Sequence, residues 1–538
     1  MSDKRIYIFD STLRDGAQTQ GIDFSSADKA AIAADLDALG IDYVEGGWPG
    51  ANPTDDAFFG EPPAFKNAKL TAFGMTRRAG RSTANDPGLK ALTEPGTPAV
   101  CIVGKTHDFH VDVALEVELD ENVEMIRDSI AHTVEIGREA IFDAEHFFDG
   151  YKDNPDYALA CVKAAYDAGA RWVVLCDTNG GTLPHEIEEI VTKVTEMVPG
   201  DHLGIHCHDD TGNAVANSLA AVRAGVRQVQ GTLNGLGERC GNANLVTLIP
   251  NLMLKMGYDT GITEDGLKQL THISRLLDER LNQAPNRSAP YVGERAFAHK
   301  GGLHVSAVEK DPKSYEHVNP EAIGNHRHVV VSDQSGRSNI LAMFRDIGLE
   351  IDDGDPKVTR LVEVVKEREF DGYAYDGAEA SFELLARRAL GEFPEYFKLT
   401  SFRVIDERRW NARGELITLS EATVKAELNG KTYMNVAEGN GPVNALDSAL
   451  RDILVPHYPE LSDVRLVDYK VRILTPSEAT GAVTRVMIES ADDTGARWST
   501  VGVSTNIIDA SFNALHDAIT YKLYRDEAPV GGRFAGAA

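Results

Sequence analysis

The stretch HLGIHCH at residues 202–208 carries the histidine pair whose spacing most directly indicates chemistry. His206 and His208 are two residues apart in an expected β-strand, so both rings lie on one face of the strand and can bind one ion. Two imidazoles with a carboxylate and an amide oxygen suit a divalent cation used as a Lewis acid, and Asp15 and Asn242 are the best candidates for these oxygens. The alternative is that His206 packs in a core and His208 caps a loop.

Two further polar residues indicate how a substrate could be bound. Arg14 directly precedes Asp15 and would place a cation where negative charge develops on a substrate oxygen. The alternative for Arg14 is a salt bridge that braces the scaffold. Thr178 could donate a hydrogen bond to a substrate carboxylate. Asp10 and Asp177 are equally compatible with a functional and with a bracing role.

The elements that must position these residues follow a regular pattern. Between residues 5 and 250, short runs rich in Val, Ile and aromatic residues alternate with Ala-rich amphipathic stretches, as in βα units around a parallel sheet. Eight strands are predicted, at residues 6–10, 43–47, 70–75, 99–104, 140–145, 172–177, 202–208 and 229–235. This pattern favours an α/β fold with a closed (β/α)8 TIM barrel, in which residues at the carboxyl ends of the strands meet at one mouth. A doubly wound open sheet is the alternative, but no Gly-rich phosphate loop follows the first strand.

Composition and periodicity divide the chain into four expected segments. We expect a TIM-barrel catalytic domain over residues 1–280, mostly helical linker subdomains that complete the active site over 281–400, an α+β regulatory domain for allostery or dimerisation over 401–525 and a flexible tail over 526–538. Residues 422–454 and 483–519 both read as strand, turn, strand, loop and helix, which predicts an internal repeat. A purely structural dimerisation role for the repeat is comparably supported.

Net charge and cysteine content limit the classes of partner and the cellular compartment that we expect. The formal net charge of −29 argues against nucleic acid and anionic membranes as partners. The five cysteines form no CxxC pair, which suits buried thiols in a reducing cytosol. Since there is neither a signal-like N-terminus nor an apolar run of about 18 residues, we expect a cytoplasmic protein without a membrane partner.

Three motifs resemble the signatures of the DRE-TIM metallolyases, in the branch of 2-isopropylmalate, homocitrate and citramalate synthases. They are DSTLRDGAQ (10–18), HCHDDTGNAVANSLAAVRAG (206–225) and GTLNGLGERCGNANL (231–245). Within that branch, EGGWPGANPTDDAFF (45–59), CDTNGGTLPHEI (176–187) and the HVNPEAIGN region (317–325) are most similar to the long-form citramalate synthases. The repeat, with GNGPVNALDSALR at residues 439–451, resembles the C-terminal allosteric domain of the branch.

This resemblance implies an acyltransferase that condenses pyruvate with acetyl-CoA and water to give (R)-citramalate and CoA. It further implies a metal-assisted Claisen condensation that opens a threonine-independent route to isoleucine, a divalent ion (Mg2+ or Mn2+, with Zn2+ also compatible), a homodimer and isoleucine as an effector. The alternatives are 2-isopropylmalate or homocitrate synthesis, a metal-dependent C–C lyase or aldolase, and a non-haem iron oxygenase, because two His and one carboxylate also suit Fe(II).

The resemblance assigns roles to individual residues. It implies that the ion is held by Asp15, His206, His208 and Asn242. Arg14 would stabilise the developing oxyanion, and Thr178 would contact the carboxylate of the 2-oxo acid. Catalytic roles are implied for Glu145 near the reacting centre and for His304 and Tyr315 from the region after the barrel, with either His304 or a Glu145-linked water as the base. Ala17 stands before Gln18 where the family usually has Glu, so the role of that acidic residue does not transfer.

Bulky side chains near the strand ends give a hypothesis about substrate choice. Phe73, Met75, Phe142 and Phe147 are expected to narrow the pocket so that pyruvate fits and 2-oxoisovalerate does not. One methylene in an apolar pocket changes binding by only ~1–3 kcal/mol, so a tight fit is needed.

Overall fold

The computed structural model describes residues 4–281, 283, 285–299, 302–329, 344, 356–391 and 393–530. These residues form two compact units. The barrel unit comprises the chain up to Phe297 together with His317–Arg327, and the C-terminal unit comprises Ala298–Glu316 together with the chain from His328 onward. Among the described helices, none combines the length and the apolarity that crossing a membrane requires.

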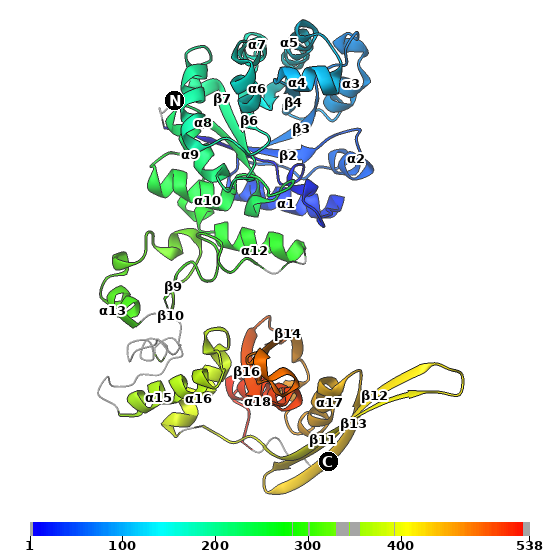
Figure 1. Ribbon diagram of the computed structural model, residues 1–538, viewed down its shortest axis with the longest axis vertical. Coiled ribbons are helices and arrows are strands. Elements are labelled where there is room, and N and C mark those ends of the chain that lie inside the picture. Colours follow the sequence, from blue (N-terminus) through cyan, green and yellow to red (C-terminus); the bar gives the residue numbers. More distant parts are fainter. Residues whose placement is uncertain are drawn as a thin grey trace. The chain divides into compact units, whose positions relative to one another are not determined.

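The barrel unit is built on eight parallel strands that close in sequence order, which confirms the predicted TIM barrel (Figure 1). They are β1 (Tyr7–Asp10), β2 (Tyr43–Gly47), β3 (Lys69–Met75), β4 (Ala99–Lys105), β5 (Glu139–Glu145), β6 (Trp172–Asp177), β7 (Leu203–Cys207) and β8 (Gln228–Gly231). The pairing of β1 with β8, from Tyr7–Gln228 to Asp10–Gly231, closes the sheet. The last strand is shorter than predicted, because residues 233–235 form a 3-10 turn around Asn234, whose φ is +55°.

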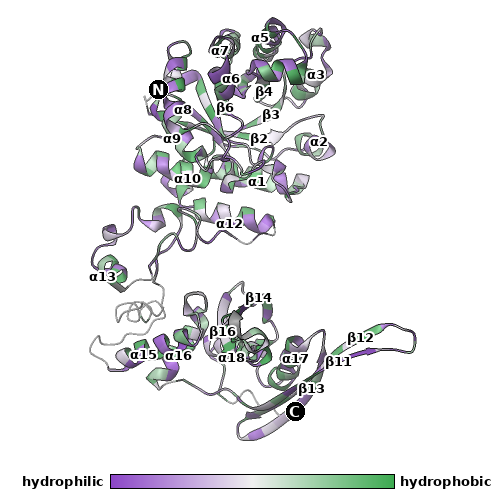
Figure 2. Cartoon of the chain, in the orientation of Figure 1, coloured by the Kyte–Doolittle hydropathy of each residue, from purple (hydrophilic) through white to green (hydrophobic). Residues whose placement is uncertain are grey.

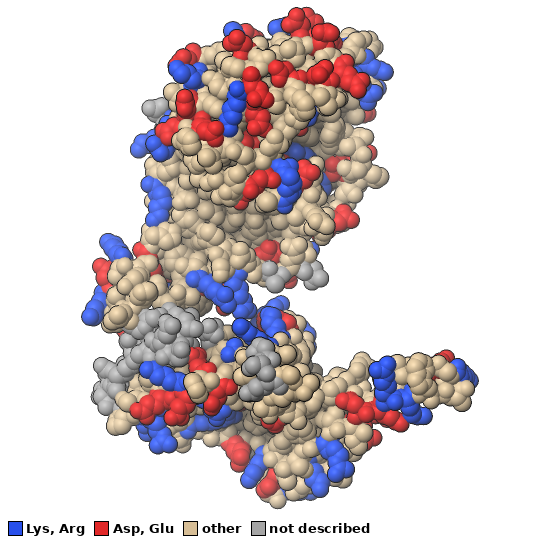
Figure 3. Space-filling model, in the orientation of Figure 1, with Lys and Arg blue, Asp and Glu red and all other residues tan. Residues whose placement is uncertain are grey.

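Helices cover the outside of the barrel wall (Figure 1); those up to α9 connect its strands, and α10, α11 and α12 follow the last strand. In chain order they are α1 (Ser26–Leu39), α2 (Pro53–Gly60), α3 (Pro87–Thr93), α4 (Asp108–His110), α5 (Leu119–Glu135), α6 (Phe147–Asp153), α7 (Pro155–Asp167), α8 (Pro184–Thr195), α9 (Ala214–Arg223), α10 (Leu245–Pro250), α11 (Glu264–Leu267) and α12 (Leu270–Arg280). Local sequence fixes their ends: Ser25 and Asp28 form a capping box at the start of α1, and Gly40, at φ +97°, ends it. These helices carry both apolar and hydrophilic residues (Figure 2), as a helix with one buried side requires. On the face shown in Figure 3, acidic side chains gather over the barrel helices, in keeping with the net charge.

Alternate residues of each strand face opposite sides of the barrel wall, so the unit has two apolar clusters. The inner one contains Phe9, Tyr43, Phe73, Cys101, Ile141, Trp172, Val174 and Cys176. The outer one, between the wall and the helices, includes Phe142, Phe147 and Cys207. The expectation that Phe142 and Phe147 narrow a pocket in the barrel is therefore wrong, because both side chains are packed against the helices.

The C-terminal unit begins with short helical segments and ends in a duplicated α+β domain. The helices are α13 (Gly302–Lys310), α15 (Pro356–Phe370) and α16 (Glu379–Leu390), and the two-residue strands β9 (Ala298–His299) and β10 (His328–Val329) pair in parallel. The duplicated part repeats three antiparallel strands and a helix. Its elements are β11 (Lys398–Trp410), β12 (Leu416–Leu428), β13 (Lys431–Gly439) and α17 (Pro442–Leu454), then β14 (Arg465–Ile473), β15 (Thr484–Ala491), β16 (Arg497–Ser504) and α18 (Ile507–Arg525).

The internal repeat is present, and each copy is one strand longer than predicted. The predicted copies begin at residues 422 and 483 and omit β11 and β14, which pair along the outer edges of β12 and β15. Of the tail predicted to be flexible, residues 526–530 are described, and Ala528 is buried; the remainder lies outside the described residues.

Candidate metal centre and active site

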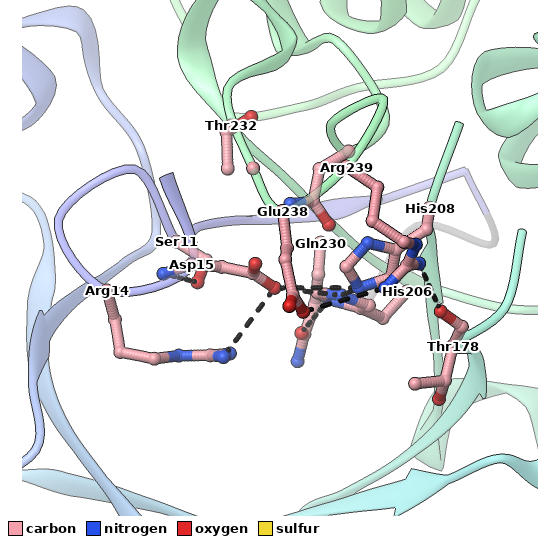
Figure 4. A network of polar contacts seen from close by, with 12 residues as sticks. Ser11, Arg14, Asp15, Thr178, His206, His208, Gln230, Thr232, Glu238 and Arg239 are labelled. Carbon is pink, nitrogen blue, oxygen red and sulfur yellow. Dashed lines mark hydrogen bonds and ion pairs between the residues drawn. The ribbon is translucent and has the colours of Figure 1, made fainter. Parts of the chain in front are cut away.

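Asp15, His206 and His208 converge at the carboxyl end of the barrel (Figure 4). His206 lies in β7, His208 directly follows that strand, and Asp15 lies in the loop after β1. The Nε2 atoms of the histidines are 3.4 Å apart, and Asp15 Oδ2 is 3.3 Å from His206 Nε2 and 3.8 Å from His208 Nε2. All three side chains are buried. The strand spacing thus brings two imidazoles and a carboxylate to one point, where a cation could be held.

Asn242 offers the fourth ligand atom. Its backbone forms an isolated bridge with His208, and its Nδ2 donates to the carbonyl of Leu236 at 3.2 Å. Its Oδ1 is buried and has no hydrogen-bond partner among the described residues. A buried amide oxygen without a partner is costly, and a cation would satisfy it. Together with the imidazoles and the carboxylate, this oxygen makes a donor set that fits a divalent ion.

Glycines shape the loop that carries Asn242. At Gly237 a Cβ atom would lie 2.1 Å from Asn242 Nδ2, and at Gly241, where φ is +98°, it would lie 2.0 Å from the carbonyl of Gly235. Neither position can hold a larger residue without moving the loop. The Gly cluster after the last strand therefore serves the close approach of Asn242 to His208.

Gln230 in β8 fixes the orientation of His206. Its Oε1 is 2.9 Å from His206 Nδ1, and its Nε2 donates to Asp143 Oδ1 at 3.1 Å. Because an amide oxygen accepts, Nδ1 of His206 carries a proton, so Nε2 is the ring atom that would bind a cation after giving up its own proton. Sequence reasoning missed Gln230, although a glutamine in a fully buried strand was a usable signal.

Arg14 is held beside the cluster by Glu45, in the middle of β2. Its Nε donates to Glu45 Oε2 at 2.8 Å, and its Nη1 lies 3.6 Å from Asp15 Oδ2. The guanidinium also lies over the ring of Phe73, 3.9 Å from the centroid, and Ser11 donates to the same Glu45 oxygen. Arg14 therefore makes the bracing salt bridge and also places a positive charge at the mouth.

Neighbouring charges set the protonation of the ligands. Burial acts to raise the pKa of Asp15, but the charge of Arg14 and the two histidines outweigh it and hold this pKa well below its usual range. Burial, and then the charge of His206, lower the pKa of His208 to about 4. Burial also acts to lower the pKa of His206, but its hydrogen bond to Asp15 and the charge of Asp15 raise it overall. At neutral pH Asp15 is thus an anionic ligand and His208 a neutral one, as metal binding requires.

Thr178, after β6, is oriented as a hydrogen-bond donor. Its Oγ1 accepts from the backbone N–H of His146 at 2.8 Å, which leaves the hydroxyl hydrogen available. Its carbonyl accepts from Arg239 Nη2 at 2.7 Å, and Arg239 also pairs with Asp210. Thr178 and Arg14 lie on opposite sides of the ligand cluster (Figure 4).

Glu145 is not part of this buried cluster, and His304 and Tyr315 lie outside the barrel unit. Glu145 ends β5, its side chain is 26% exposed, and its Oε2 is 2.6 Å from Lys105 Nζ. His304 and Tyr315 belong to the C-terminal unit, where their rings stack with centroids 4.1 Å apart. The structure brings these two predicted residues together, and their action beside the barrel stays a prediction.

Asp10 and Asp177 brace loops. Asp10 accepts from the backbone N–H and the hydroxyl of Thr12, each at 2.8 Å, and Asp177 accepts from the hydroxyl of Thr182 at 2.9 Å. Both carboxyl groups are buried. These contacts agree with the bracing interpretation. Of the residues expected to narrow the pocket, Phe73 lies against Arg14, and Met75 is 40% exposed.

Comparisons with known proteins agree with this architecture. Residues 5–277 match the HMGL-like family, residues 291–369 match the homocitrate synthase post-HMGL domain-like family, and residues 376–523 match the LeuA allosteric (dimerisation) domain. The (R)-citramalate synthase of Aquifex aeolicus is 51% identical over 526 residues, which cover 97% of this chain and 99% of that protein.

Two further relatives also match over nearly the whole chain. The (R)-citramalate synthase of Geobacter sulfurreducens is 51% identical over 531 residues, which cover 98% of this chain and 99% of that protein. The 2-isopropylmalate synthase of Methylorubrum populi is 31% identical over 546 residues, which cover 98% of each chain. With its closed barrel, its buried histidine pair and these full-length relatives, the chain belongs to the HMGL-like family and, within it, to the family of the (R)-citramalate synthases.

Proposed function

We propose that this protein condenses pyruvate with acetyl-CoA and water to form (R)-citramalate and CoA. The observation that carries the proposal is the buried group of Asp15, His206 and His208 beside the unpartnered oxygen of Asn242, in a chain about half identical to synthases of this name. A divalent cation bound by these four residues, with Mg2+ or Mn2+ preferred and Zn2+ compatible, would supply Lewis acidity to a carbonyl oxygen.

The roles of the chain's own residues follow from their positions. Arg14, held by Glu45 at 2.8 Å, places a fixed positive charge where the carbonyl oxygen of pyruvate becomes negative. Thr178 donates its free hydroxyl hydrogen to the carboxylate of pyruvate. These two groups orient the 2-oxo acid so that its C2 atom faces the second substrate.

A base is needed to remove a proton from the methyl group of acetyl-CoA. Glu145, directly or through a water, and His304, stacked on Tyr315, are the candidates. The resulting carbanion forms the new C–C bond at C2 of pyruvate. Water then cleaves the thioester, and CoA leaves as the thiol, so the reaction needs no redox partner.

Regulation and assembly are part of the same proposal. Residues 376–523 match a LeuA allosteric (dimerisation) domain. This match supports a homodimer. Isoleucine, the end product of the pathway that citramalate would open, is the inhibitor that we propose for this domain. The free cysteines of the described residues suit a reducing compartment, in keeping with the expected cytoplasmic location.

The decisive experiment is a thiol-release assay with acetyl-CoA and a panel of 2-oxo acids, with and without a chelator. We expect the highest kcat/KM with pyruvate, loss of activity with the chelator and recovery with Mn2+ or Mg2+. A preference for 2-oxoisovalerate would assign the chain to 2-isopropylmalate synthesis, the activity named for the 31% identical relative. Activity with Mg2+ under anaerobic conditions excludes the iron oxygenase.

A further inference from the structure

His146 adopts an unusual backbone conformation at the edge of the candidate active site. It joins β5 to α6 with φ +59° and ψ +31°, in the left-handed region that residues other than glycine seldom adopt. The residue is only 8% exposed. A buried side chain kept in this conformation beside a candidate active site calls for a role.

Four contacts hold His146 in this position. Its N–H donates to Thr178 Oγ1 at 2.8 Å, and its ring stacks on that of His110, with centroids 3.8 Å apart and planes 11° apart. Its Nε2 lies 4.0 Å from Glu145 Oε1, and its Nδ1 lies 4.0 Å from Asp149 Oδ2. The imidazole thus lies between two carboxylates and against a second ring.

The same contacts restrict the position of the Glu145 carboxylate. One Glu145 oxygen is 2.6 Å from Lys105 Nζ, and the other faces His146. A separation of 4.0 Å is longer than a hydrogen bond, but such contacts in unliganded active sites often tighten when substrate binds. Asp149 is itself fixed, because Asn179 Nδ2 donates to it at 2.7 Å. Glu145 therefore lies between Lys105 and the His146 ring, and that ring is itself stacked on His110 and faces Asp149.

We propose that His146 is a positioning residue for the condensation: its backbone orients the Thr178 hydroxyl, and its imidazole holds the Glu145 carboxylate in place. The inference rests on the proposed function, because Thr178 and Glu145 act there on the 2-oxo acid and on acetyl-CoA. The two parts of the role are separable, since the hydrogen bond to Thr178 comes from the backbone and the contact with Glu145 comes from the ring.

The test uses the full-length His146→Gly variant, because glycine adopts positive φ freely and keeps the backbone N–H. We expect the KM for pyruvate to stay within about twofold, while kcat falls on the order of 10- to 100-fold as Glu145 loses its position. Millimolar imidazole, which can occupy the space of the missing ring, should restore a large part of kcat. A purely structural role of the backbone would not respond to imidazole.

Glu116→Gly is the matched control, because Glu116 is exposed and has φ +55° directly after the helical turn of residues Val111–Leu115. The kcat of wild type and of this variant is measured at the same imidazole concentration. These values show how much imidazole changes the activity by binding to the metal. A wild-type kcat in His146→Gly, or a loss that imidazole does not restore, overturns the inference. If His146→Gly fails to fold, His146→Asn replaces it, since Asn tolerates positive φ. A wild-type kcat in His146→Asn would likewise contradict the positioning role.

The wild-type assay separates the two proposals. Absence of CoA release by the wild-type enzyme with pyruvate contradicts the proposed function. An active wild type with an unimpaired His146→Gly variant contradicts the positioning role alone.

Discussion

The unpartnered oxygen of Asn242 gives the sharpest prediction at the scale of single residues. Asn242→Ala removes a ligand atom and leaves Asp15 and both histidines in place, so we expect the affinity for Mn2+ to fall at least about tenfold. The measurement is a titration of the chelated enzyme with Mn2+, followed by CoA release. Asn213→Ala is the control, because Asn213 lies in the loop after β7, just before α9, and its side chain donates locally to the carbonyl of Thr211. Equal Mn2+ affinities in the two variants would contradict the assignment.

Gln230 offers a second test with a control on the same strand. Gln230→Leu deprives His206 Nδ1 and Asp143 of their partner, so we expect Mn2+ affinity to fall about 10- to 100-fold. Gln228, two residues earlier in β8, has two buried polar atoms without a partner among the described residues. Gln228→Leu should therefore leave metal binding unchanged and be neutral or stabilising in thermal unfolding. If both variants bind Mn2+ with the same affinity, Gln230 does not orient His206 for metal binding.

The sequence predicted those site residues that depend on local spacing. His206 and His208 share a strand face whatever the rest of the fold does, and Asp15 follows a strand end in any parallel barrel. Gln230 and Glu45 depend on partners in other strands: Gln230 contacts His206 of β7 and Asp143 of β5, and Glu45 contacts Arg14 after β1. Such pairs are set by the register across the closed sheet, which one sequence does not reveal.

At the scale of elements, the end of β1 predicts a pH-dependent stability. Burial raises the pKa of Asp10 to about 7, well above the usual range of an aspartate. A carboxyl group with a raised folded-state pKa favours the folded state most at low pH, and this contribution is lost as the pH rises through about 7. Asp10→Asn is neutral at every pH and keeps an acceptor for Thr12. We therefore subtract the Tm of wild type from the Tm of Asp10→Asn at each pH. We expect this difference to be more positive at pH 8 than at pH 5.

Asp28→Asn is the control for this pH dependence. Hydrogen bonds from Ser25 lower the pKa of Asp28, so its carboxylate stays ionised across this interval and its substitution should change the Tm equally at both pH values. A Tm difference for Asp10→Asn that is the same at pH 5 and pH 8 would show that Asp10 is not protonated in the folded barrel.

The strands that sequence reasoning found and missed differ in burial. The eight barrel strands are largely buried, so their apolar runs are visible in the sequence. β11 and β14 lie at sheet edges with most residues exposed, and β11 carries Asp406, Glu407, Arg408 and Arg409 in succession. Charged edge strands lack the alternation that marks a half-buried strand, which explains why the repeat was predicted without them.

At the scale of the whole molecule, the chain enters the C-terminal unit twice. It leaves the barrel unit after Phe297, rejoins it from His317 to Arg327 and then continues in the C-terminal unit. His304 and Tyr315 lie in the first of these two excursions, so their stacked rings belong to a different unit from the buried histidine pair. Residue spacing alone carries no information on this division, and only the family resemblance pointed to these two residues.

The sheet of β11, β12 and β13 carries the last prediction, which concerns assembly. Helix α17 packs on one side of this sheet, and on the other side Met434 and Val436 of β13 are 62% and 48% exposed. Such neighbouring apolar residues are typical of a surface that a second chain covers. If that chain is another copy, Met434→Glu places a charge in the interface and should raise the dissociation constant of the dimer at least about tenfold. Met434→Leu keeps the face apolar and should leave the dimer intact. Sedimentation velocity across a dilution series distinguishes the outcomes, and a dimer that tolerates the glutamate must form through another surface.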